Sequence, residues 1–410
     1  MTTQTLTRAS LSATGKWGFF LILLMVFSFR ADFRLPIAGL LVHPYLLLLP
    51  LAYFLAQVNV NAIPQKVTVP LLLFFVVFSL AALQNINPLS EIFKVGASLA
   101  TFLFFALSVK SEKDFEWMSW GLMICAATIG VLGFLVGEET TGVGARLSGI
   151  NVLEGIGNKN AQSLFTLPGV FLGSYLLIKA IAQKRFLKVI VMISFLFFTV
   201  ISIFLSANRS GWLGLAIIAV STFFVMGLKG RTILFSMVLV VISYLAVELY
   251  ASDIFERKRM QTTEGYSSDV GRQLLMRQSL TVGLENPVFG VGMDELHRQM
   301  AIRLKLGRFR IEKMDTHFLP GYIIGSSGVI ALVLFFTFLY QLTSKHLAGA
   351  SRFDFVRQAR MMVIFFVILF VARSFFSREI LYSPTFMGGL GLVFSYYLFQ
   401  LRKANSLSRG

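Results

Sequence analysis

The chain has 410 residues, of which 56% are hydrophobic and only 14% are charged, with a formal net charge of +17. The charged fraction of a soluble globular domain is about 25%, so this composition excludes that class. The positive residues lie mostly in short segments between apolar runs, which argues against a nucleic-acid-binding protein. The single cysteine, Cys125, excludes an intrachain disulfide.

Apolar runs of about 18–22 residues recur along most of the chain, and each could cross a ~30 Å hydrocarbon core. They predict an all-α polytopic membrane protein with about 12 transmembrane helices, because a β-barrel would show segments of about ten alternating residues. The predicted spans are 17–30, 36–57, 67–84, 91–109, 116–137, 161–181, 188–206, 211–228, 232–250, 317–342, 359–377 and 384–401.

The distribution of Lys and Arg predicts how the chain is oriented. With the N-terminus in the cytoplasm, the Lys/Arg-rich short connections and the C-terminal tail all fall on the cytoplasmic side, as the positive-inside rule requires. We therefore expect both termini to be cytoplasmic and the long loop 251–316 to lie outside, which in a Gram-negative bacterium means an inner (cytoplasmic) membrane protein with this loop in the periplasm. The expected order is an N-terminal tail (1–16), helices 1–9 (17–250), a periplasmic loop (251–316), helices 10–12 (317–401) and a C-terminal tail (402–410).

The long periplasmic loop carries structure of its own. A helix is predicted over 269–285, and Asn286-Pro287 marks its end. The basic, partly apolar stretch 297–313 follows and suits a segment lying on anionic lipid. Gly290-Val291-Gly292 between them is interpreted as a turn.

Several polar residues lie where predicted spans meet the external side. Taken singly, each has a structural explanation: an arginine in a tight turn can anchor a span end, and a histidine at a helix start can be a capping residue. If the helices bundle, however, these ends converge on one external site. The residues are Arg209 in "SANRSGW", Arg272 on the loop helix, Arg146, Asn158 and Asn160 before the sixth span, and His317 at the start of the tenth.

Other site chemistries find little support in the sequence. Asp315 and His317 could offer two metal ligands, but no third lies nearby, so no metal site is expected. No "GxSxG" stretch is present for a serine nucleophile, and no cofactor is expected. Arginines hold phosphate or diphosphate, and a histidine can accept a proton near neutral pH. Together they suit displacement at a carbon whose leaving group is a phosphate.

Four stretches in this order resemble the O-antigen ligase and O-antigen polymerase family of bacterial membrane glycosyltransferases. They are "RLSG…GNKN", "SANRSGW", "GRQLLMRQSLTVGLENPVFGVG" and "THFLPGYIIGSSGVIAL", within residues 140–340. Spans 1–5 and 11–12 match that family only in hydropathy.

The resemblance implies a fold of the GT-C type and a metal-independent, inverting transfer from an undecaprenyl-diphosphate-linked glycan donor. By this resemblance, His317 is the catalytic base, and Arg209 and Arg272 bind the diphosphate. Arg146 is assigned to donor binding with them. We further expect contacts to donor or acceptor from Asn158, Asn160, Arg277 and Asp315.

The resemblance leaves the acceptor open. Phe318 follows His317 where many polymerase-like members have Asn, whereas "GNKN" is closer to exopolysaccharide polymerases. One hypothesis is O-antigen ligation to lipid A core, whose phosphates suit the basic stretch 297–313. A second is an O-antigen or exopolysaccharide polymerase that uses another lipid-linked repeat as acceptor. A third, from a different class, is a transporter of the lipid-linked glycan. No nucleic-acid partner is expected, and membrane lipids surround the chain.

Overall fold

The computed structural model describes residues 11–30, 35–37, 40–56, 62–136, 159–205, 209–226, 268–304, 316, 318–344 and 353–408. Within these residues the chain forms thirteen α-helices, a short 3₁₀ helix and a two-stranded antiparallel sheet. The α-helices are α1 (Ala13–Arg30), α2 (Pro44–Leu55), α3 (Gln65–Ala82), α4 (Pro88–Ala106), α5 (Glu112–Val136), α6 (Lys159–Ala182), α7 (Phe186–Leu205), α8 (Arg209–Met226), α10 (Ser268–Glu285), α11 (Met293–Arg303), α12 (Leu319–Thr343), α13 (Asp354–Ser374) and α14 (Pro384–Leu407). The 3₁₀ helix is η4 (Arg378–Tyr382), and the strands are β1 (Leu35–Ile37) and β2 (Leu40–Val42).

The prediction of a polytopic helical membrane protein is confirmed. The ninth predicted span, 232–250, lies outside the described residues, and each of the other predicted spans contains a helix. In the described part of the chain, 6 helices are long and apolar enough to cross a membrane: Gln65–Ala82, Pro88–Ala106, Gln162–Ala182, Phe186–Ile203, Leu319–Thr343 and Asp354–Ser374. Shorter apolar helices are Ala13–Met25, Pro44–Leu55 and Ser210–Val225. The loop helix predicted over 269–285 is present as α10.

The second predicted span departs from continuous helix at its start. Residues Leu35–Ile37 and Leu40–Val42 pair as the β1–β2 hairpin, with Leu35 opposite Val42. Helix α2 begins only at Pro44, since a proline has no N–H to donate and suits the first helical position. Its 12 residues are about 18 Å long, less than the ~30 Å hydrocarbon core. The prediction of one helix over 36–57 is therefore wrong in its first part.

Helix α14 forms the centre of the bundle. It packs against α4, α13, α6 and α5, and its side chains are buried continuously from Pro384 to Leu398. Gly391 allows the close approach to α4, because a Cβ there would collide with the carbonyl oxygen of Phe102. The amide of Val109, just after α4, donates to Ser395 Oγ at 3.0 Å, so α4 and α14 run in the same direction. Neighbouring helices therefore surround α14. If α14 faced lipid instead, its surface would have to be more apolar.

Helix α12 is divided into two parts with different surroundings. Every residue from Leu319 to Gly328 is buried, whereas beyond Gly328 a stripe of apolar side chains is exposed: Ile330, Val333, Phe336 and Tyr340. The spacing of this stripe places it on one helix face, as for a helix that faces lipid. Helix α3 packs along α12 in the antiparallel sense, with Phe74 against Phe335 and Phe78 against Tyr322.

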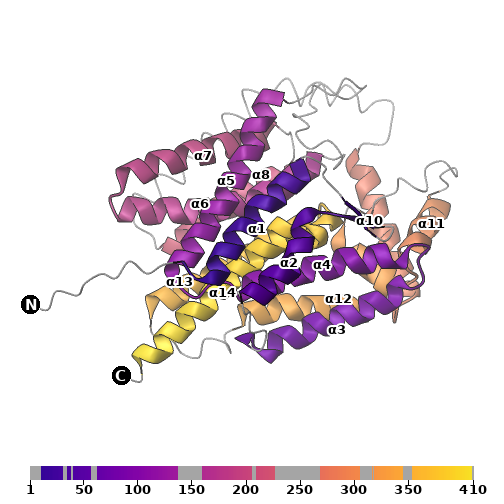
Figure 1. Ribbon diagram of the computed structural model, residues 1–410. Helices are drawn as coiled ribbons and strands as arrows, with labels where there is room; N and C mark the ends of the chain where they lie inside the picture. Colours follow the sequence, from indigo (N-terminus) through magenta and orange to yellow (C-terminus); the bar gives the residue numbers. More distant parts are fainter. Residues whose placement is uncertain are drawn as a thin grey trace, which may run out of the picture.

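The two ends of the bundle carry different polar groups. Figure 1 shows α10 and α11 at the end of the molecule opposite the C-terminal end of α14. At that C-terminal end, Lys403 Nζ lies 3.2 Å from Glu112, and Lys179 Nζ lies 2.8 Å from Glu116. Helices α10 and α11 belong to the loop predicted to be periplasmic, so a periplasmic site would lie at their end of the bundle.

Candidate active site

The predicted site residues are only partly covered by the structure. Outside the described residues lie His317, Arg146, Asn158 and Asp315. For Arg209 and Asn160 the backbone alone is described, at the first residue of α8 and the second of α6. Arg272 and Arg277 are exposed on α10. Their roles therefore stay predictions, and the structure brings together a further set of residues.

Helix α10 packs directly on the first turns of α12. Ser279 is fully buried at this contact, and a Cβ at Gly321 would collide with its hydroxyl oxygen. Gly283 lies equally close to Ile324, since a Cβ there would come within 2.9 Å of its side chain. Arg272 precedes Ser279 by seven residues, about 10 Å along a helix axis. The small residues thus hold the helix that bears Arg272 against the start of α12.

The segment after α10 lies beside a break in α12. Gly328 has φ 83° and ψ 176°, which interrupts the helical backbone. Hydrogen bonds to the segment 287–292 satisfy groups on both sides of the break: Val329 N donates to Pro287 O at 2.7 Å, and Gly325 O accepts from Val291 N at 2.9 Å. The interpretation of 290–292 as a turn agrees with its positive-φ glycines. Non-helical backbone within a membrane helix requires such protein partners, because lipid offers none.

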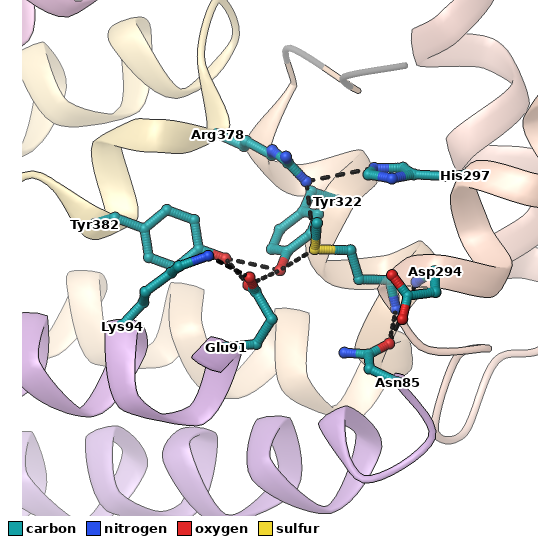
Figure 2. Close-up of polar contacts among 9 residues, drawn as sticks. Asn85, Glu91, Lys94, Asp294, His297, Tyr322, Arg378 and Tyr382 are labelled. Carbon is teal, nitrogen blue, oxygen red and sulfur yellow. Dashed lines mark hydrogen bonds and ion pairs between the residues drawn. The ribbon is translucent and has the colours of Figure 1, made fainter. Parts of the chain in front are cut away.

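A buried polar group joins α4, α12 and η4 (Figure 2). Tyr382 donates to the Tyr322 oxygen at 2.7 Å, and Tyr322 donates to Glu91 Oε2 at 3.3 Å. The Tyr382 oxygen also lies 3.1 Å from this carboxylate oxygen, and Lys94 Nζ lies 2.7 Å from Glu91 Oε1. Burial, with the Tyr322 hydroxyl and the Glu91 carboxylate nearby, holds the pKa of Tyr382 well above its usual value, so Tyr382 stays a neutral donor.

Arg378 extends this group towards α11. Its Nη1 donates to His297 Nε2 at 3.4 Å and to Met293 Sδ at 3.6 Å, and its Cζ lies 5.0 Å from the centroid of the Tyr322 ring. Figure 2 shows the guanidinium between the Tyr322 ring and His297. We name the seven residues the Glu91–Arg378 cluster: Glu91, Lys94, Met293, His297, Tyr322, Arg378 and Tyr382.

The start of α11 is fixed by the connection between α3 and α4. Asn85 Oδ1 accepts from the amides of Met293 at 2.6 Å and Asp294 at 3.3 Å, and Asp294 Oδ2 accepts in return from Ile86 N at 2.7 Å. These bonds satisfy helix-terminal N–H groups as a capping residue would. They also fix where α11 places Met293 and His297 in the cluster.

A second arginine lies deeper, at the end of α13. Arg373 is almost completely buried and donates to the hydroxyl of Ser210, which follows Arg209 in the first turn of α8. Glu379 in η4 is close enough to interact electrostatically with Arg373. The first turn of α8 thus meets the end of α13 near η4.

Sequence reasoning missed most of these residues. Arg378 and Tyr382 lie in the short connection "SREILYSP" between the last two predicted spans. Arg209 was singled out as a charged residue at an external span end, and the same signal could have found Arg378. His297 was included only in a basic stretch, and Tyr322 gave no signal within an apolar run. In the described part of the chain, no group of three His, Cys, Asp or Glu residues lies close enough to hold a metal ion.

The fold and these residues define a polytopic helical membrane protein with a polar, arginine-containing site at one end of its bundle. A comparison with family models gives the finer identification: residues 193–336 match the family described as O-antigen ligase. These residues thus form a domain like that of the O-antigen ligase family, whose members are enzymes of the glycosyltransferase type. The match runs from α7 into the second part of α12 and so includes Arg209, Arg272 and His317. A search of curated proteins found no match.

Proposed function

We propose that the protein transfers a glycan from undecaprenyl diphosphate to an acceptor hydroxyl, and that this acceptor is the lipid A core. The observation that carries the proposal is the family match over residues 193–336, because it spans the three residues to which the chemistry is assigned. The family supports lipid-linked glycan substrates in general. The choice of lipid A core as acceptor rests on the basic stretch 297–313, which suits a densely phosphorylated acceptor.

In the proposed reaction the acceptor oxygen attacks the anomeric carbon of the donor sugar with inversion. The bond from that carbon to the diphosphate oxygen breaks, and undecaprenyl diphosphate leaves with the electron pair. His317 takes the proton of the acceptor hydroxyl as general base, while Arg209 and Arg272 stabilise the charge that develops on the diphosphate. Arg146 adds to donor binding, and no metal or cofactor takes part.

Contacts to the two sugars are assigned to residues around this centre. We place Asn158, Asn160, Arg277 and Asp315 at the donor or acceptor. Arg277 is exposed on α10, as Arg272 is, and lies five residues further along this helix.

The proposed orientation puts this chemistry at the periplasmic face of the inner membrane. In favour of it, the Glu91–Arg378 cluster lies where the first turns of α4 and α12 meet connections that the charge distribution assigns to the periplasm, namely 85–91, the 251–316 loop and 377–384. The ion pairs of Lys179 and Lys403 involve span ends assigned to the cytoplasm. A periplasmic site also suits a donor displayed in the outer leaflet.

Lipopolysaccharide from a deletion strain tests ligation directly. We expect gel electrophoresis to show lipid A core without O-chain, together with accumulated lipid-linked glycan. Retention of a single repeat on the core, or loss of a secreted polysaccharide alone, would contradict ligation. Either result would favour the polymerase, in line with the resemblance of the "GNKN" segment to exopolysaccharide polymerases. Purified protein supplied with donor and acceptor separates both enzymes from a transporter, because a transporter makes no glycosylated product.

A further inference from the structure

Arg373 is a charged residue inside the bundle, in the last turn of α13, and it is almost completely buried. A charge in a membrane helix is costly to bury, so such residues are rare, are held by specific partners and mark functional sites. A basic side chain at a helix end can bond the carbonyls of its own helix. The side chain of Arg373 reaches another helix, where Nη1 donates to the hydroxyl oxygen of Ser210 in α8.

The surroundings of Arg373 are themselves fixed by polar contacts. Glu379 lies close enough to interact electrostatically with Arg373, and its amide donates to Ser377 Oγ at 3.2 Å. Thr385 Oγ1, at the start of α14, donates to the carbonyl oxygen of Leu164 in α6 at 3.0 Å. These bonds join the end of α13, η4 and the start of α14 to one another and to α6. The guanidinium of Arg373 can therefore act as a fixed point for α8.

Helix α8 packs along α13 in the antiparallel sense. Ser210, near the start of α8, contacts Arg373 near the end of α13. Phe224, near the end of α8, packs against Phe365 in the middle of α13, with ring centroids 5.5 Å apart. Apolar packing thus holds the body of α8, and the hydrogen bond from Arg373 holds its first turn.

The first turn of α8 also contains Arg209, which is the first residue of the helix and the neighbour of Ser210. Successive residues of an α-helix differ by about 100° around its axis, so a fixed Ser210 fixes the direction in which the backbone presents the residue before it. Helix ends fray when nothing holds them. A guanidinium on a frayed turn loses the fixed geometry that paired hydrogen bonds to a diphosphate require.

We propose that Arg373 is a positioning residue for the donor diphosphate, because through Ser210 it holds the first turn of α8 and so orients Arg209. The inference rests on the proposed function, in which Arg209 binds the diphosphate, and adds the group that prepares this arginine for binding. Arg373 acts through Arg209 and not on the substrate. Its contribution must therefore disappear when Arg209 is removed.

Binding of undecaprenyl diphosphate, the lipid part of the proposed donor, tests the proposal without any need for turnover. The Kd is measured on the purified protein by native mass spectrometry. Ser210→Ala removes only the acceptor oxygen, whereas truncation of Arg373 would remove a buried charge and its packing at once. In Ser210→Ala the Kd is expected to rise about threefold to thirtyfold, as for residues coupled in one hydrogen-bond network. If Ser210→Ala did not fold, Arg373→Lys would take its place, because it keeps the charge but not the planar donor group.

Ser221→Ala is the matched control on the same helix. Ser221 is also buried in α8, but its hydroxyl donates to the carbonyl oxygen of Ile218 within that helix, at 2.7 Å. The Kd of Ser221→Ala for undecaprenyl diphosphate is expected to equal that of the wild-type protein. A rise as large as that in Ser210→Ala would mean that any lost hydroxyl in α8 weakens binding, and would contradict the proposal.

A double variant separates positioning from a purely structural role. In the Arg209→Ala background, Ser210→Ala is expected to add nothing to the Kd, because the arginine on which it acts is absent. A structural role would instead weaken binding by the same factor in both backgrounds. Undecaprenol, which carries a hydroxyl in place of the diphosphate, should bind all of these proteins equally.

Two further outcomes would overturn the inference and leave the proposed function standing. They are a wild-type Kd in Ser210→Ala, and an equal loss of affinity with and without Arg209. A wild-type Kd in Arg209→Ala would remove Arg209 from donor binding, and the inference would fall with that assignment. If the wild-type protein bound undecaprenyl diphosphate no more tightly than undecaprenol, the proposed donor itself would be refuted.

Discussion

Val329 donates a 2.7 Å hydrogen bond from its amide to the carbonyl oxygen of Pro287, so the segment that follows α10 is bonded to the backbone of α12 where that helix is broken. The amide of Val329 lies directly after Gly328, whose φ of 83° a side chain would strongly disfavour. The loop and the helix thus form one unit, and a disturbance of either would displace the helix that carries Arg272.

Gly328→Ala is expected to destabilise the protein by about 1–3 kcal/mol, the cost of holding an alanine in a sparsely populated backbone region. Its Cβ would also collide with the carbonyl oxygen of Val288. Thermal unfolding in detergent measures the effect. Gly96→Ala is the control, because a Cβ there meets only the edge of the Phe75 ring at 3.3 Å. Equal unfolding temperatures for the two variants would contradict the strain.

Tyr322→Phe is expected to lower stability by about 1–3 kcal/mol, because it leaves buried polar groups without a partner. Its hydroxyl is both the acceptor for Tyr382 and a donor to Glu91. Tyr340→Phe removes a hydroxyl from a side chain that is 64% exposed and should leave the unfolding temperature unchanged. A similar small effect in both variants would mean that the tyrosine pair is not structurally coupled to Glu91.

Asn85→Ala is expected to cost about 1 kcal/mol, because α11 loses the acceptor for its first amides. Hydrogen exchange of the Met293 and Asp294 amides should accelerate, since both donate to Asn85 Oδ1. Asn87→Ala serves as a matched control: Asn87 precedes α4, but its side chain makes no capping hydrogen bond there. Unchanged exchange at α11 in Asn85→Ala would argue against this cap.

His317→Ala is expected to reduce the transfer rate by about 10²- to 10⁴-fold, the usual contribution of a positioned general base. Membrane insertion and folding should be retained. Single-turnover measurement with saturating donor and acceptor reports the chemical step. A rate near that of the wild-type protein would remove His317 from the proposed mechanism.

Arg209→Lys is expected to lose most activity although the charge is kept, because an ammonium cannot reproduce the forked contact of a guanidinium with a diphosphate. The KM for the donor is the informative quantity. Arg185→Lys is a suitable comparison, since Arg185 lies in the turn before α7 and on the side assigned to the cytoplasm. Full activity of Arg209→Lys would make Arg209 an anchor of the span end.

The helices could be predicted because a membrane span is a local property of the sequence. An apolar run of sufficient length is helical in lipid whatever its neighbours are, so spans such as 67–84 and 188–206 coincide with α3 and α7 within a few residues. The start of the second span was mispredicted because the mean hydropathy of an apolar run does not register where its prolines lie. Pro36 and Pro44 restrict the backbone, and the helix begins only at Pro44. For the candidate site, the predicted arginines and His317 came from motif order and from resemblance, and the structure leaves their roles to experiment.

By itself the sequence determined the membrane class, the order of the helices, the loop helix over 269–285 and the match of residues 193–336 to the O-antigen ligase family. These depend on hydropathy, on helix-stop residues and on short motifs, all of which are local. Only the tertiary structure decided that Glu91, Tyr322, Tyr382 and Arg378 form one hydrogen-bonded group with His297. These residues come from four distant segments, and nothing local in an apolar run marks a tyrosine whose partner lies in another helix. Helices α4 and α12 both pack against η4, and α11 packs against α12, so the arrangement of the whole bundle brings those segments together.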